Sequence, residues 1–198
     1  LISACTADVY AKPELSVALS RSLDATSLRQ ETGQDAAQRL HVTLLPQTVA
    51  VGIDPHAQRL RTTRGTLPYS KLILAQGARP VEHPAFPVSL VWRINTLAAW
   101  AALRTCIGQN ARRIVIVGAG LVGCELAEDA ARAGHTVTLV YRGHYPLASL
   151  LPAQAGARLQ QQLSNCGVTL IPEATVSSVK RTEDGAAVLL EAGEILAA

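Results

Sequence analysis

The stretch Ile114-Val115-Ile116-Val117-Gly118-Ala119-Gly120-Leu121-Val122-Gly123 decides the fold. It opens with four β-branched residues, a pattern that favours a strand buried on both faces of a parallel sheet. Three glycines follow with the spacing GxGxxG. Residues 121–133 then have the apolar spacing of a helix that ends at Gly134, and residues 135–141 form another strand-like run. Because the motif lies between a strand and a helix, it predicts a dinucleotide-binding βαβ unit rather than an ordinary glycine-rich turn.

Each glycine of this motif has its own physical task. Gly118 lets the chain turn tightly out of the strand, Gly120 leaves room for a pyrophosphate to approach the backbone, and Gly123 lets the helix pack closely on the strand. The phosphates then lie on the free N–H groups and the positive dipole end of the helix. The expected nucleotide-binding residues are therefore Gly118, Ala119, Gly120, Leu121, Val122 and Gly123.

The end of the following strand decides between the two nicotinamide nucleotides. An acidic residue there accepts hydrogen bonds from the ribose 2′-hydroxyl of NADH, whereas a nearby arginine accommodates the 2′-phosphate of NADPH. This sequence has Tyr141 and Arg142 at that point, with no acid. Arg142 favours NADPH, and Gly123 suits the tight turn of NADH enzymes. The sequence leaves the choice open.

Composition limits the kind of protein further. The chain has 198 residues, 48% hydrophobic and 17% charged, which is typical of a globular protein with a packed core. The net charge of +3 is too small to indicate a nucleic-acid partner. No apolar run is long enough for a membrane span, and charged residues near the start interrupt any signal peptide. We therefore expect a cytoplasmic protein with no nucleic-acid or membrane partner.

The four cysteines give no sign of a redox dithiol or a metal centre. They are Cys5, Cys106, Cys124 and Cys166, and no two have the spacing CxxC or CxxxxC. They fit the reduced thiols of a cytosolic protein, and no metal ligands are expected.

The remaining sequence alternates between short strands and helices. Prolines at 80, 84 and 87 indicate a boundary between two regions. Before it we expect helices near Glu14 and over 26–38, with strands over 40–45, 48–53, 59–63 and 69–75. After it we expect helices over 97–107, 121–133 and 154–165, with strands over 113–117, 135–141, 168–171, 175–180 and 188–191.

Several further motifs carry a resemblance to a known family. They are Tyr10-Ala-Lys12-Pro13-Glu-Leu15-Ser16, Leu45-Pro-Gln-Thr48, Tyr69-Ser-Lys-Leu-Ile-Leu-Ala75-Gln-Gly77-Ala-Arg79-Pro80, Gly118-Ala-Gly-Leu-Val-Gly-Cys-Glu-Leu-Ala127 and Leu147-Ala-Ser-Leu-Leu-Pro152. With these motifs the chain resembles the rubredoxin and flavorubredoxin reductase branch of the FAD-dependent pyridine nucleotide–disulfide oxidoreductases. The resemblance implies an α/β fold of two nested, doubly wound, Rossmann-like domains.

The resemblance also implies domain limits. Residues 1–92 would be a partial FAD-binding domain, and residues 93–198 an NAD(P)-binding domain without its C-terminal end. An opening βαβ unit of roughly 30 residues would be missing before Leu1. Since that loss exposes sheet edges, we expect the chain alone to bind FAD poorly.

Further site residues are implied by the resemblance alone. Lys12 and Pro13 would lie near the flavin, the backbone of Ala50 would meet the adenine of FAD, and the segment containing Ala75, Gly77 and Arg79 would pass close to the dinucleotide. Glu125 would reach toward the flavin edge and pair with Lys12, which would hold positive charge near N5. The alternatives are an acid that only stabilises the helix dipole and a solvated loop lysine.

The activity implied is transfer of a hydride from NADH or NADPH to FAD, followed by electron transfer to rubredoxin or flavorubredoxin. Because no dithiol is present, electrons would pass straight from flavin to the protein partner. Another acceptor, such as ferredoxin, a nitrite reductase subunit or oxygen, remains an alternative. So does a non-catalytic nucleotide-binding fragment.

Overall fold

A computed structural model describes residues 1–198, and packing divides them into two compact units. The first unit consists of Leu1–Ala11 and Thr26–Arg79, and the second of Lys12–Ala25 and Pro80–Ala198. The chain therefore enters the second unit briefly at Lys12, returns to the first, and enters the second again at Pro80. The assignment of residues 1–92 to FAD and 93–198 to the nicotinamide nucleotide stays a prediction.

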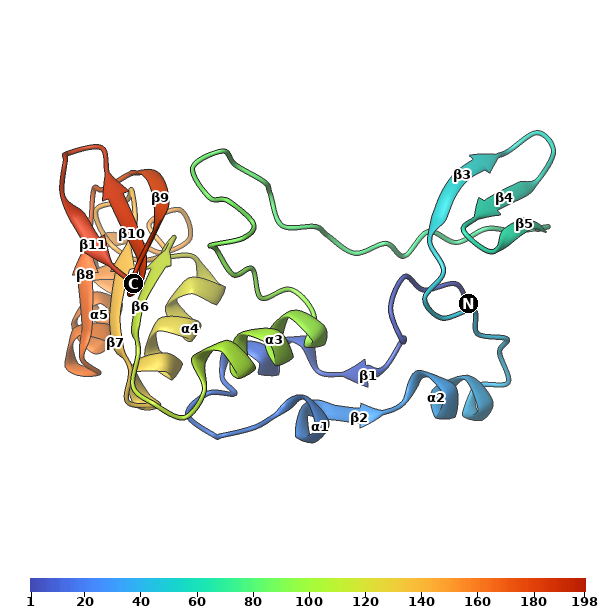
Figure 1. Ribbon diagram of the computed structural model, residues 1–198, viewed down its shortest axis with the longest axis horizontal. Coiled ribbons are helices and arrows are strands. Elements are labelled where there is room, and N and C mark those ends of the chain that lie inside the picture. Colours follow the sequence, from blue (N-terminus) through green and yellow to red (C-terminus); the bar gives the residue numbers. More distant parts are fainter. The chain divides into compact units, whose positions relative to one another are not determined.

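The centre of the second unit is a parallel sheet of three strands in the order β6-β7-β8 (Figure 1). The strands are β6 (Arg113–Val117), β7 (Thr136–Val140) and β8 (Val168–Ile171), and Ile116 of β6 pairs with Leu139 of β7. Helix α4 (Leu121–Arg132) connects β6 to β7, and α5 (Ala153–Asn165) precedes β8. β7 is the central strand, and its residues Val137, Leu139 and Val140 are fully buried, as a strand covered on both faces requires.

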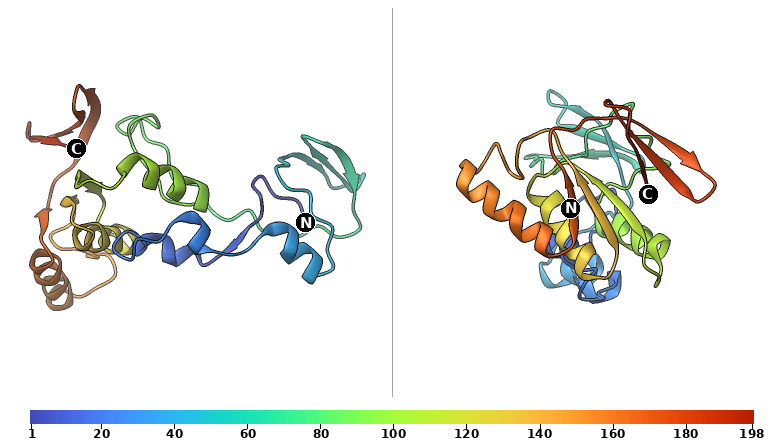
Figure 2. Two further views of the ribbon diagram at one scale, coloured as in Figure 1. Left: turned by 60° about the horizontal axis from the view of Figure 1, so that its bottom comes forward. Right: turned by 90° about the vertical axis from the view of Figure 1, so that its left-hand side faces the viewer.

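An antiparallel sheet covers the side of the parallel sheet that α4 and α5 leave open (Figure 2, right). Its order is β11-β10-β9, formed by β9 (Val176–Thr182), β10 (Gly185–Leu190) and β11 (Ile195–Ala197). Val176, Val179 and Val188 form a buried cluster with Val140, against which Val115 packs. The second unit is thus built of helices, a parallel sheet and an antiparallel sheet.

The second unit has two further helical elements, which contact each other. Helix α3 (Leu97–Ile107) begins at the N-cap Thr96, whose hydroxyl accepts a hydrogen bond from the amide of Ala99 at 3.2 Å, and it buries Trp100 completely. The 3₁₀ helix η1 (Lys12–Ser16) contacts both α3 and α4. The family-like motif around Lys12 is therefore packed against the helix that begins in the glycine motif.

The first unit consists of small sheets and short helices. Strands β1 (Val9–Tyr10) and β2 (Arg29–Glu31) pair antiparallel. A meander follows, formed by β3 (Ala50–Asp54), β4 (Arg59–Thr62) and β5 (Gly65–Pro68) in that order, and Leu60 at its centre is buried. The two helices are α1 (Ala25–Leu28) and α2 (Gly33–Arg39). No helix of the chain is both long and apolar enough to cross a membrane.

The structure corrects several of the sequence predictions in the first unit. The helix expected over 26–38 is interrupted by β2. The strand expected over 40–45 is reduced to a single bridge between Ile2 and Leu45. The strand expected over 69–75 is wrong, because the tight turn after Thr62 places β5 at Gly65–Pro68 beside β4 and residues 69–75 pair with no strand. Apolar sequence alone does not form a strand, since its backbone groups need a neighbouring strand.

Candidate functional site

The glycine motif forms the turn from β6 into α4. Gly118 has a φ of +103°, a conformation that favours glycine, and its amide donates a 2.8 Å hydrogen bond to the carbonyl of Val140 on β7. At Gly123 an added Cβ would lie 1.9 Å from the carbonyl oxygen of Gly118. Gly123 therefore allows the first turn of α4 to pack directly on the glycine turn, as the sequence predicted.

Gly120 is the N-cap of α4 and provides no side-chain cap. The first hydrogen bond of the helix joins the amide of Cys124 to the carbonyl of Gly120 at 3.0 Å, so the amides of residues 121–123 precede the helical hydrogen-bond ladder. An added Cβ at Gly120 would meet nothing within 4 Å, and Leu121 and Val122 are exposed. This helix start has the open, donor-rich surface that a phosphate group requires.

Tyr141 and Arg142 follow β7 at the same edge of the sheet, with opposite exposure. The Tyr141 side chain is only 4% exposed, and its buried hydroxyl has no hydrogen-bond partner. Burial raises the pKa of this hydroxyl, and the neighbouring Cys124 raises it further. Arg142 is exposed. Tyr141, which was predicted to lie at the ribose, therefore points into the core, whereas Arg142 faces solvent.

The loop after β7 is attached to the glycine turn. The amide of Leu147 donates a hydrogen bond to the carbonyl of Ala119 at 2.9 Å, and the amide of Glu173 donates one to the carbonyl of Gly143 at 3.2 Å. His144 Nδ1 lies 3.0 Å from a carboxylate oxygen of Glu173. The loop and the glycine turn thus form one edge that could hold an adenosine phosphate.

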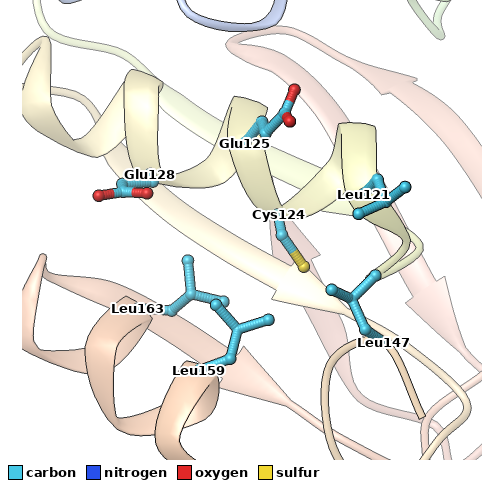
Figure 3. A pocket seen from close by; sticks show the side chains of 7 residues that line it. All are labelled: Leu121, Cys124, Glu125, Glu128, Leu147, Leu159 and Leu163. Atoms are coloured by element: carbon cyan, nitrogen blue, oxygen red, sulfur yellow. The ribbon is translucent and has the colours of Figure 1, made fainter. Parts of the chain in front are cut away.

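On α4, Glu125 faces η1 rather than α5. Figure 3 shows its carboxylate pointing away from Leu159 and Leu163 of α5, and the hydroxyl of Ser16 donates a short hydrogen bond to it. Lys12 is exposed and forms no ion pair with Glu125. The structure brings Glu125 to η1, the 3₁₀ helix that contains Lys12, but the contact is made by Ser16 instead of the expected Lys12.

Asp129, one turn further along α4, makes contacts that the sequence did not predict. Its carboxylate is buried and accepts hydrogen bonds from the amides of Leu19 at 2.7 Å and Ser20 at 3.1 Å, and from the hydroxyl of Ser20. The sequence did contain an indication of these contacts. Glu125 and Asp129 are four residues apart and therefore share one face of the helix. Together the two acids fasten residues 16–20 to α4.

The other face of α4 forms a mainly apolar pocket with α5 (Figure 3). The side chain of Cys124 points into it, toward Leu147 and Leu159. Burial, with a smaller contribution from Glu125, raises the pKa of the Cys124 thiol to about 11. All four cysteines are free. Cys124 therefore has the properties of a core residue rather than of a reactive thiol.

The remaining predicted site residues, other than Pro13 in η1, belong to the first unit. Ala50 begins β3 and pairs with Thr62. Ala75, Gly77 and Arg79 lie in an exposed segment without regular structure, in which Gly77 has a φ of +66°. Their roles toward FAD stay predictions.

Comparison with known proteins identifies the family. The sequence-family model of the pyridine nucleotide-disulphide oxidoreductases matches residues 1–198. The chain belongs to this family. The α/β, Rossmann-like fold expected from the sequence is confirmed, and the role of the glycine turn at the start of α4 in nucleotide binding stays a prediction.

Several curated relatives carry the same name. The chain is 43% identical over 172 residues to a nitric oxide reductase FlRd-NAD(+) reductase of Aeromonas hydrophila, covering 86% of this chain and 44% of the relative. It is 36% identical over 191 residues to the protein of that name from Klebsiella pneumoniae, covering 96% and 50%. The chain thus spans about half the length of these relatives.

Solved structures of oxidoreductases have the same fold. A covalent putidaredoxin reductase–putidaredoxin complex aligns with a TM-score of 0.86 at 26% identity, covering 100% of this chain and 49% of that one. A ferredoxin reductase from Rhodopseudomonas palustris aligns with a TM-score of 0.87 at 25% identity, covering 99% and 49%.

Proposed function

We propose that the protein is a cytoplasmic flavoprotein reductase that takes a hydride from NADH or NADPH and delivers electrons to a small redox protein of the rubredoxin or flavorubredoxin type. The observation that carries the proposal is the glycine turn, in which Gly123 packs on Gly118 and the amides of residues 121–123 precede the first helical hydrogen bond. The relatives named FlRd-NAD(+) reductases support this acceptor class.

The residues present fit a nicotinamide dinucleotide. The open space beside Gly120 is the volume that a side chain would fill, and a pyrophosphate can use it instead. The positive end of α4 and its free amides would balance the phosphate charge. Gly118, Ala119, Gly120 and the amides of residues 121–123 would therefore hold the pyrophosphate.

The family resemblance assigns FAD-binding roles separately to Lys12 and Pro13 in the second unit and to Ala50, Ala75, Gly77 and Arg79 in the first. When bound, FAD supplies the acceptor for the hydride and the donor of single electrons to the partner. Lys12 fits this role in one respect, since its ammonium group is exposed and bound to no carboxylate. Its charge would favour the negative charge that a hydride adds to the flavin.

Glu125 and Asp129 would act as positioning residues in this function. Glu125 binds Ser16 of η1, and Asp129 binds the backbone that follows η1. The segment that carries Lys12 is thereby fixed to the helix whose start would hold the nicotinamide nucleotide. Such fixed placement of two reacting groups is the main contribution a protein makes to cofactor chemistry.

The test combines calorimetry with absorption spectroscopy of the purified protein. We expect NAD(P)⁺ to bind. Because the chain alone is expected to bind FAD poorly, FAD is added in large excess, and it should lose its visible absorption faster than in protein-free controls when NADH or NADPH is supplied without oxygen. Oxidised rubredoxin should then restore the absorption. Nucleotide binding without flavin reduction would indicate a non-catalytic nucleotide-binding protein, and absence of nucleotide binding would refute the proposal.

A further inference from the structure

We infer that the nucleotide site selects NADPH over NADH, and that Arg142 makes the selection by binding the 2′-phosphate. The inference rests on the proposed function, because it names the nucleotide that the same site takes. The relatives described above are named as NAD(+) reductases. This chain would therefore differ from them in its electron donor.

The first step is the lack of a hydrogen-bond acceptor for an unmodified ribose. An NADH site places a carboxylate at the end of the second strand, where it accepts hydrogen bonds from the ribose hydroxyls. In this chain the position is held by Tyr141, whose side chain is 4% exposed. Its hydroxyl is buried beside Cys124 without a partner. Tyr141 therefore fills the core under the site and offers nothing to a ribose.

The second step is the position of Arg142. The residue two places before it, Val140, binds the amide of Gly118, and Leu147, five places after it, binds the carbonyl of Ala119. Arg142 thus lies in a short loop whose two ends are hydrogen-bonded to the glycine turn. A dinucleotide with its pyrophosphate on that turn would extend its adenosine ribose toward this loop.

The third step is charge. Arg142 is exposed and takes part in no ion pair or side-chain hydrogen bond. The neighbouring acid, Glu173, is bound to His144 at 3.0 Å. The loop therefore presents one arginine without a carboxylate partner. The planar guanidinium group matches a phosphate with two parallel hydrogen bonds.

Gly123 does not oppose this inference. Its added Cβ would lie 1.9 Å from the carbonyl oxygen of Gly118 and within 4 Å of Ile116, so the glycine is required by packing inside the turn. That requirement holds whichever nucleotide is bound. Gly123 therefore does not distinguish between the two nucleotides, and the preference depends on Arg142.

The test measures binding and not turnover. Isothermal titration of the protein with NADP⁺, NAD⁺, 2′,5′-ADP and 5′-AMP should give about tenfold or tighter binding to the two ligands with a 2′-phosphate, since a charge-assisted hydrogen bond is worth about that factor. Arg142→Ala should remove this preference while changing NAD⁺ affinity less than about twofold. Added salt should weaken NADP⁺ binding more than NAD⁺ binding.

Arg113→Ala is the matched control. Arg113 is an exposed arginine at the amino end of β6, the opposite edge of the same sheet, and its loss should leave both affinities unchanged. Binding of NAD⁺ as tight as NADP⁺ by the unaltered protein would overturn the inference and leave the proposed function intact. Binding of neither nucleotide would overturn both. If Arg142→Ala failed to fold, the NADP⁺ to NAD⁺ ratio of the unaltered protein would decide alone.

Discussion

The carboxylate of Asp129 on α4 accepts a 2.7 Å hydrogen bond from the backbone amide of Leu19, across 110 positions of sequence. Its other oxygen accepts bonds from the amide and the hydroxyl of Ser20. A buried carboxylate with several donors and no cation is stable only while those donors remain in place. Asp129 therefore fixes the segment after η1 to α4.

Asp129→Ala should lower the free energy of unfolding by about 3 kcal/mol, because it leaves buried amides without an acceptor. Asp129→Asn should cost less, since its amide oxygen still accepts one bond. Urea denaturation measures both. Glu128→Ala is the control on the same helix, because its ion pair with the exposed Arg132 is screened by solvent and its loss should cost much less than the loss of Asp129. Equal losses for Asp129→Ala and Glu128→Ala would contradict the anchoring role.

Alanine at the second and third glycines of the motif should have separate effects. Gly120→Ala meets nothing within 4 Å and has a φ of −79°, so the fold should be kept. Its methyl group would occupy the pyrophosphate space, and nucleotide affinity should fall about tenfold or more. Gly123→Ala would clash with the carbonyl of Gly118 and should lower the melting temperature. Calorimetric titration and thermal denaturation measure the two effects, and unchanged affinity in Gly120→Ala would refute the assignment.

The second unit shows how much of the fold the sequence can predict. α3, β6 and β8 lie where the pattern placed them, because strand, glycine turn and helix there each agree with the local sequence. In contrast, Ile73 is 89% exposed within a segment predicted to be a strand. Periodicity indicates which residues are able to pair, but the pairing itself depends on a neighbouring strand that the segment does not encode.

In the candidate site, the sequence predicted the local glycine turn but not the contacts between distant segments. The glycine turn follows from local spacing, since one chain segment supplies all of it. The hydrogen bond from Ser16 to Glu125 and the one from Ser20 to Asp129 each join positions more than 100 residues apart. The inward position of Tyr141 depends on how α4 packs on β7. Such contacts are set by tertiary packing, so a single sequence does not reveal them.

Thiol labelling should distinguish Cys124 from the exposed cysteines. With its pKa raised to about 11, the buried Cys124 thiol is almost entirely protonated at pH 8. Cys5 and Cys106 are exposed. Iodoacetamide should modify these two first and spare Cys124 until urea is added, as peptide mass spectrometry would record. Modification of Cys124 as fast as Cys5 in the folded protein would show that α4 and α5 do not cover it.

His135 should make the protein less stable as the pH falls. Burial and the charges of Arg104 and Arg112 lower the pKa of His135, and its Nδ1 accepts a 3.1 Å hydrogen bond from the amide of Arg112. Below about pH 6.5 the unfolded chain therefore binds a proton more readily than the folded protein. Stability falls as the pH decreases from that value, and this loss ends once the pH is below the pKa of His135 in the folded protein.

His135→Asn keeps an acceptor that does not titrate. Urea denaturation of the two proteins between roughly pH 8 and pH 5.5 should show a steeper loss for the unaltered protein than for His135→Asn. Parallel curves would show that His135 does not contribute to the pH dependence.

Residues 12–25 belong to the second unit, although the residues on both sides of them belong to the first. This arrangement affects which segments relatives can exchange by recombination. A chimera that replaces only the residues from 80 onward would bring in a new α4 but retain the old segment that Asp129 and Glu125 hold. The recipient's Ser16, Leu19 and Ser20 would then face acids selected for another partner. Recombination between relatives should therefore succeed when both stretches are exchanged together, because this short segment and the distant helix are held by the same hydrogen bonds.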